Sequence, residues 1–136
     1  MLRRVMMSWL NDAEVTTLEQ RAEQHAANLL AKLEEKRKAA EALGVTVNGI
    51  RYSGDPANRA ALMEVVQFAR EGQQATFVAW KDSDGSWHNN HPLSEVEQAL
   101  HAIAQRRGAL IALEGQYQAQ VVAGEIDSIE GLSWEV

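Results

Sequence analysis

Two histidines near the middle of the chain raise the question of a metal site, because imidazole is a common zinc ligand. His88 and His91 are three residues apart, and on one continuous strand they would point to opposite faces, since strand side chains alternate. No aspartate or glutamate lies close by at a known ligand spacing, and a structural zinc site is held by four ligands. We therefore expect no metal, and we interpret both histidines as exposed polar residues beside a loop.

The segment 82–85 (Asp-Ser-Asp-Gly) has the carboxylate spacing with which a calcium-binding loop begins. Counting from Asp82, however, the sixth position is Trp87 rather than glycine, and the twelfth is Leu93 rather than glutamate. An aspartate in the first place and a glycine in the fourth suit a type I turn instead. The segment is therefore interpreted as the turn of a hairpin.

No serine stands in a pattern typical of a nucleophile. Ser94 opens a capping box with Glu97, and Ser83 and Ser86 fall in a turn. The chain has no cysteine, which excludes disulfides, thiolate metal sites and cysteine nucleophiles. The G-x-S-x-G, phosphate-loop and G-x-G-x-x-G patterns do not occur. We expect a protein that is not an enzyme and that needs no cofactor.

One aromatic and amide-rich cluster could bind a ligand. It consists of Trp80, Trp87, His88, Asn89 and Asn90, and the possible ligand surface is Trp80, Trp87, Asn89 and Asn90. Aromatic faces beside amide donors can hold a sugar or a loop of a partner protein. The alternative is that the tryptophans belong to the core and the amides to a loop, and the sequence favours this second interpretation.

Length and charge limit the remaining classes. The chain has 136 residues, which suits one domain with an extension, and 46% of them are hydrophobic, enough for a core. The net charge of −6 argues against a nucleic-acid partner, since such proteins carry a basic face. The chain contains no apolar stretch of about 20 residues, so we expect no membrane span.

The first predicted element is a helix over residues 13–43, where glycine and proline are absent and good helix formers dominate. Asn11 or Asp12 could cap it, and Gly44 ends it. At 1.5 Å per residue it would be about 45 Å long and would extend beyond a small domain. Its apolar seam approximates a heptad repeat, which suits self-association or partner docking, but packing on its own domain stays open. The seam consists of Leu18, Ala22, His25, Leu29, Lys32, Lys36, Ala40 and Leu43.

The next predicted element is a hairpin over residues 45–52. Its central Asn48-Gly49 favours a two-residue type I′ turn, in which both residues need positive φ. This register pairs Val47 with Ile50 and Val45 with Tyr52, and all four share one face.

A helix, a second hairpin and a third helix follow. Asp55 and Pro56 begin the helix, which Gly72 ends. The hairpin runs from Ala75 to Asn90, and Thr76, Val78 and Trp80 are expected on one side of its first strand. Ser94 caps the third helix, which Gly108 and Gly115 could kink and Gly124 ends. Four apolar residues of the tail could tie it to the body: Ile126, Ile129, Leu132 and Trp134.

These elements predict an α+β fold: a long N-terminal helix, then a small antiparallel sheet of two hairpins packed with two helices. The hairpins are expected to join into one sheet, because an isolated two-stranded hairpin is only marginally stable. The corresponding domains are residues 1–43, an arm and long helix for oligomerisation or partner docking, and residues 44–136, a compact α+β domain.

Several of these segments together resemble a phage-associated domain family of unknown function, found in or beside bacteriophage tail-fibre proteins. The resemblance covers roughly residues 35–134, and residues 1–30 lie outside it. It implies a tail component or tail assembly factor and transfers no catalytic residue. The segments that carry it are 44–52, 78–81, 84–87 and 93–94, with Ile129 and Trp134.

The sequence therefore predicts a non-enzymatic structural or adaptor protein that binds a tail-fibre or baseplate protein, or copies of itself. It would be found in the virion tail, or in the cytoplasm of the infected bacterial host during assembly. The alternatives are a tail-fibre assembly chaperone and a receptor- or glycan-binding tip. Aromatic and methionine side chains suit interfaces, so the predicted contacts are Val5, Met6, Met7, Trp9, Leu10, Leu18 and Leu29.

Overall fold

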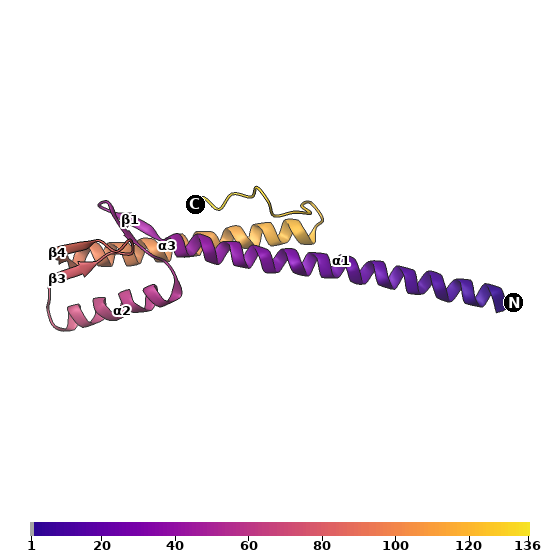
Figure 1. The fold of residues 1–136 in the computed structure, drawn as a ribbon, viewed down its shortest axis with the longest axis horizontal. Coiled ribbons are helices and arrows are strands. Elements are labelled where there is room, and N and C mark those ends of the chain that lie inside the picture. Colours follow the sequence, from indigo (N-terminus) through magenta and orange to yellow (C-terminus); the bar gives the residue numbers. More distant parts are fainter. Residues whose placement is uncertain (1) are drawn as a thin grey trace.

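The computed structural model describes the backbone of residues 2–136 and the side chains of residues 17–136. Three helices and two hairpins alternate along the chain, which confirms the predicted α+β class (Figure 1). Their bounds are α1 Leu2–Leu43, β1 Val45–Val47, β2 Ile50–Tyr52, α2 Pro56–Glu71, β3 Thr76–Lys81, β4 Trp87–Pro92 and α3 Leu93–Val122.

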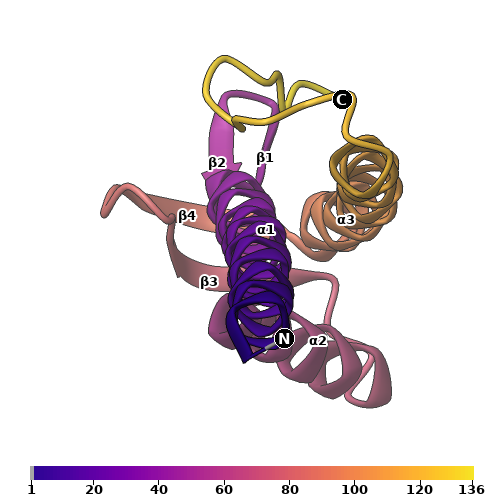
Figure 2. The same cartoon turned by 90° about the vertical axis from the view of Figure 1, so that its right-hand side faces the viewer.

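Helix α1 spans most of the length of the molecule, and the hairpins and α2 lie at and beyond its C-terminal end (Figure 1). The two hairpins and α2 surround the first half of α3, while the second half of α3 runs beside α1. The tail after α3 folds back over these two helices, as the view along the long axis also shows (Figure 2). The N-terminal half of α1 has no other described element beside it. In the part of the chain that is described, no helix is apolar enough over sufficient length to cross a membrane.

Helix α1 starts earlier than predicted, because the helix continues through Asn11 and Asp12 instead of beginning at either. It ends as predicted at Gly44, which adopts φ +72°. A Cβ on Gly44 would lie 1.8 Å from the carbonyl oxygen of Tyr52, and one on Gly54 would lie 2.1 Å from that of Glu41. Two glycines therefore allow the end of α1 and the chain leaving β2 to cross in close contact.

The first hairpin confirms its prediction in detail. Asn48 and Gly49 have φ values of 51° and 78°, as a type I′ turn requires. Val45 pairs with Tyr52 and Val47 with Ile50. The start of α2 is also as predicted, because the Asp55 carboxylate accepts a hydrogen bond from the Asn58 amide at 2.8 Å.

The two hairpins form separate two-stranded sheets, so the expectation of one joined sheet is wrong. The turn between β3 and β4 contacts β2 mainly through a side chain. The Arg51 guanidinium donates to the Asp84 carboxylate at 2.9 Å, to the Ser83 carbonyl at 3.2 Å and to the Leu43 carbonyl at 3.2 Å. These bonds tie β2, the turn and the end of α1 together without a strand ladder.

Helix α3 is continuous through Gly108 and Gly115, so neither glycine interrupts it. It begins at Leu93, one residue before the predicted cap, and no side chain caps it. The Leu93 amide donates instead to the Ala75 carbonyl at 2.9 Å, so β4 passes directly into the helix. Ser94 therefore lies inside the first turn, and the predicted capping box is wrong.

Two hydrophobic clusters hold the molecule together. The first joins the hairpins, α2 and the start of α3, and its buried members are Val47, Tyr52, Leu62, Val66, Val96, Ala99 and Ile103. The second joins α1, the end of α3 and the tail, and it confirms that the tail packs on the body. Its buried members are Leu29, Leu33, Val121 and Ile129, with Ile126, Leu132 and Trp134 packed against them.

A partly buried ion network joins α1 to α3. The Arg37 guanidinium lies 3.0 Å from the Glu41 carboxylate and 3.2 Å from that of Glu114. Arg107 adds a second contact to Glu41 at 3.2 Å. Because Arg37 and Glu41 are nearly buried, removal of either partner would leave an uncompensated charge.

Alanine substitutions at two glycines should change stability in opposite directions. Gly44→Ala should lower the free energy of unfolding by more than about 2 kcal/mol, because the new methyl group meets the Tyr52 carbonyl at a left-handed position. Gly115→Ala should raise it by about 1 kcal/mol, since the site is open and alanine favours the helix. Urea unfolding followed by circular dichroism measures both. Equal effects of the two substitutions would contradict the close crossing.

Candidate binding surfaces

The cluster predicted as a ligand surface is divided between two environments. Trp87 is 68% exposed, and Asn89 and Asn90 are exposed with it. Trp80 is half-buried, with its ring centroid 5.2 Å from that of Phe77 and packed against the first cluster. A ligand on the outer face of this hairpin would therefore meet Trp87 and the two asparagines rather than Trp80.

Ordinary strand alternation causes this division, because Trp80 pairs with His88 and Trp87 pairs with Lys81, which places the two tryptophans on opposite faces. A left-handed residue in β4 changes the positions that follow. Asn90 has φ 53°, which interrupts the extended conformation and with it the strict alternation of side chains. The sequence predicted that His88 and His91 point to opposite faces of the strand. Their ring centroids instead lie 6.0 Å apart. The opposite strand shows the same change, because Val78 is exposed whereas Trp80 faces inward.

The two histidines belong to a polar network under the second hairpin. His91 is only 3% exposed, so the prediction that both histidines are exposed is wrong. The Tyr52 hydroxyl lies 2.5 Å from His91 Nε2, and His91 Nδ1 lies 3.7 Å from the Glu95 carboxylate. Beside them, His88 Nε2 is 2.7 Å from the Asp82 carboxylate. Among the side chains of residues 17–136, no group of three or more His, Asp or Glu could hold a metal ion.

Burial keeps the central pair of this network neutral. It raises the pKa of Tyr52 to about 12, and the Glu95 and Asp82 carboxylates add to the increase. It also lowers the pKa of His91. A neutral His91 can accept a hydrogen bond from the Tyr52 hydroxyl at Nε2 and keep its own proton on Nδ1. Since both side chains are almost fully covered, the pair is a structural tie between β2 and β4.

The predicted seam of α1 has two different surroundings. From His25 to Lys36 it faces the chain's own tail, and Leu29 packs inside the second cluster. Residues 17–25 are all exposed, and the Leu18 side chain is 61% exposed. The side chains of the predicted anchors lie outside the described residues: Val5, Met6, Met7, Trp9 and Leu10.

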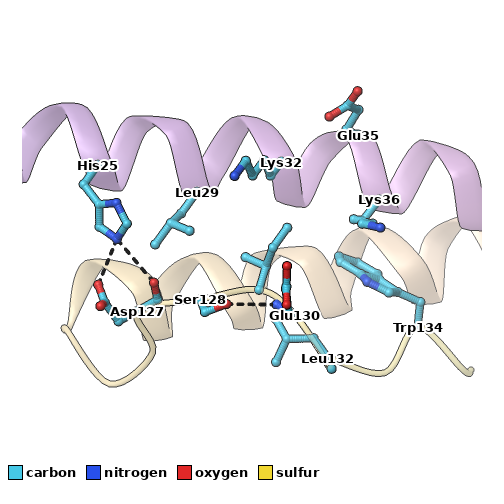
Figure 3. A pocket seen from close by; sticks show the side chains of 12 residues that line it. His25, Leu29, Lys32, Glu35, Lys36, Asp127, Ser128, Glu130, Leu132 and Trp134 are labelled. Atoms are coloured by element: carbon cyan, nitrogen blue, oxygen red, sulfur yellow. Dashed lines mark hydrogen bonds and ion pairs between the residues drawn. The ribbon is translucent and has the colours of Figure 1, made fainter.

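An open groove of about 650 Å³ lies between α1 and the tail (Figure 3). His25 and Asp127 meet at one end, with Nε2 and the carboxylate 2.9 Å apart, and Lys36 and Trp134 line the other end. Lys32 points into the groove between these ends (Figure 3). The lining mixes ammonium groups, carboxylates and apolar side chains, which suits contact with a polar segment of a partner.

A second groove, of about 460 Å³, lies between α2 and α3, where the sequence predicted no site. Its α2 wall holds Met63, which is 61% exposed, and its α3 wall holds Gly108 and Ile111. The only signal in the sequence was an apolar residue on the outer side of each helix. Neither residue reveals that the two helices diverge enough to leave a groove.

The chain belongs to a family described as a domain of unknown function (DUF4376), whose model matches residues 19–132. No curated protein and no solved structure matches the chain. The family description states no activity.

The buried imidazole should make stability depend on pH in a predictable direction. Unfolded, His91 titrates near its ordinary pKa of 6.5, whereas its pKa in the folded protein is lower. Between these two pKa values the unfolded chain binds more protons, so the free energy of unfolding should fall as the pH falls below about 6.5. His91→Gln should remove this slope, measured by urea unfolding between about pH 5 and 7.5.

The matched control is His101→Gln, at an exposed histidine of α3. This variant should retain the wild-type slope. An unchanged slope in His91→Gln would show that the imidazole is not excluded from water as described.

Proposed function

We propose that this protein is a non-enzymatic structural or adaptor component of a bacteriophage tail, attached to a tail-fibre or baseplate protein through the N-terminal half of α1. One observation carries the proposal: about half of a 42-residue helix extends beyond the body that its other half helps to build (Figure 1). A helix without tertiary packing is marginally stable in water, so a long unaccompanied helix favours a partner that covers it.

The sequence at the start of this helix supports such a partner. It contains Val5, Met6, Met7, Trp9 and Leu10 within six positions. Tryptophan and methionine are enriched at protein interfaces, where they contribute large apolar contacts. The exposed Leu18 continues the apolar character toward the body.

The phage context rests on the resemblance of the body to domains found in or beside tail-fibre proteins. The segments that carry it form the first hairpin, most of β3, the turn after β3 and the start of α3, together with Ile129 and Trp134 of the tail. The protein would then occur in the virion tail, or in the cytoplasm of the infected bacterium during assembly. The same features would serve a tail-fibre assembly chaperone that is absent from the finished particle.

A second candidate function is a receptor- or glycan-binding tip on the outer face of the second hairpin. The specific observation in its favour is that Trp87, Asn89 and Asn90 are exposed together. An exposed tryptophan ring beside amide groups can stack on a sugar and hydrogen-bond to its hydroxyls. The inward position of Trp80 reduces this surface to a single aromatic ring.

Deletion of residues 1–12 should abolish attachment and leave a folded body. Phage lacking the gene would be complemented with the full chain or with residues 13–136, and the protein in purified tails quantified by immunoblot. We expect the truncated chain to be absent from tails. Its circular dichroism and melting temperature should show an intact body, because both hydrophobic clusters lie outside the deletion. Undiminished incorporation would refute this placement of the attachment site.

Trp87→Ala distinguishes the adaptor from the tip. The side chain is 68% exposed, so the variant should fold normally. An adaptor attached through α1 should leave adsorption of the phage to its host unchanged. A loss of adsorption by a folded, incorporated Trp87→Ala protein would favour the receptor-binding function instead.

A further inference from the structure

The groove between α2 and α3 is apolar at its floor and basic at its edges. Ala60 and Met63 of α2 face Ala104, Gly108 and Ile111 of α3 across it. The lining also includes Arg59 and Arg107 and no carboxylate. Arg107 is paired with the Glu41 carboxylate at 3.2 Å, whereas no ion pair within the described residues holds Arg59. The surface therefore suits a helix that has an apolar stripe and acidic flanks.

The α3 wall is unusually open to the backbone of another helix. A Cβ added to Gly108 or to Gly115 would meet nothing within 4 Å. A glycine inside a helix destabilises it by about 1 kcal/mol relative to alanine. No contact within the described chain requires a glycine at either position. Gly108 lines the groove and allows a second helix to approach closely there. Gly115, seven residues later, lies on the same face of α3 outside the groove lining.

The molecule itself contains a helix of the required kind. Residues 11–24 contain four carboxylates, Asp12, Glu14, Glu19 and Glu23, and a single arginine. Within this segment Leu18 and Ala22 are one turn apart and exposed. We propose that residues 11–24 of α1 from a second copy of this chain bind in the groove between α2 and α3.

The segment cannot reach the groove of its own chain. Helix α1 is continuous, and Leu18 lies about 38 Å along it from Leu43, on the side away from the body. All three helices run roughly along the long axis of the molecule (Figure 1). Two copies with antiparallel α1 helices can therefore place each arm in the groove of the other, which makes a closed two-fold dimer.

This dimer goes beyond the proposed function and does not depend on a phage partner. It uses residues 11–24 and leaves the apolar tip before them for attachment to another protein. If the protein does not dimerise, the result expected for the deletion of residues 1–12 in phage tails stays the same. Conversely, a chain that never enters tails could still dimerise through the groove.

Sedimentation of the full chain tests the proposal. Wild type should sediment as a dimer, and Met63→Asp should raise the dissociation constant at least about tenfold by placing a charge in the groove. The matched control is Phe68→Asp, a similarly exposed position of α2 outside the groove, which should dimerise like wild type. Circular dichroism should show that both variants are folded. A wild-type chain that is monomeric at all concentrations, or equal dimerisation of the two variants, would overturn the proposal.

A disulfide experiment identifies the contacting segments directly, because the chain has no cysteine of its own. Leu18→Cys protein mixed with Met63→Cys protein should form a mixed disulfide dimer under mild oxidation. Leu18→Cys mixed with Phe68→Cys should not. A dimer that is lost in Leu18→Asp but kept in Met63→Asp, without the mixed disulfide, would mean that two arms pair with each other and the groove is not used.

Discussion

The close crossing of two backbone segments at the end of α1 determines how the other elements are placed. Gly44 lies against the Tyr52 carbonyl, and Gly54 lies against the Glu41 carbonyl, at separations that no side chain could enter. Because the hairpin between these glycines begins and ends at the same point of α1, it must turn back over the helix end. Tyr52 is thereby directed into the first cluster, and α1 is directed away from the hairpins along α3.

The polar groups of the core follow from this placement. Tyr52 brings a hydroxyl into a dry environment, and a buried hydroxyl needs a partner. His91 supplies it from the second hairpin, so a buried hydrogen bond joins two sheets that share no ladder, in addition to the bonds of Arg51. Farther along, the ion network of Arg37, Glu41 and Glu114 fixes α1 on α3, and the tail covers the apolar surface that remains. Among the described residues, packing thus secures only the C-terminal half of α1, and we propose that the other half serves an interaction outside the chain.

Local chemistry made much of this fold predictable. Asn48-Gly49 specifies its own turn, Asp55-Pro56 specifies a helix start, and Gly44 specifies a helix end, so each could be predicted without knowledge of its surroundings. The predictions were wrong where tertiary contacts determine the local conformation. The left-handed conformation of Asn90 places His91 in the interior. The Ala75 carbonyl accepts a hydrogen bond from the Leu93 amide, so α3 begins one residue earlier than predicted. The groove between α2 and α3 depends on the angle between two helices, which no spacing of residues in one helix reveals.

Mass spectrometry of purified phage particles, from the host that makes this protein, tests the central claim most directly. An adaptor attached through α1 should be present at a fixed ratio to the major tail proteins. Recovery only from the lysate of infected cells, bound to unassembled fibre protein, would replace the adaptor with a chaperone. Absence from both the particles and the fibre complexes would contradict the proposed association with the tail.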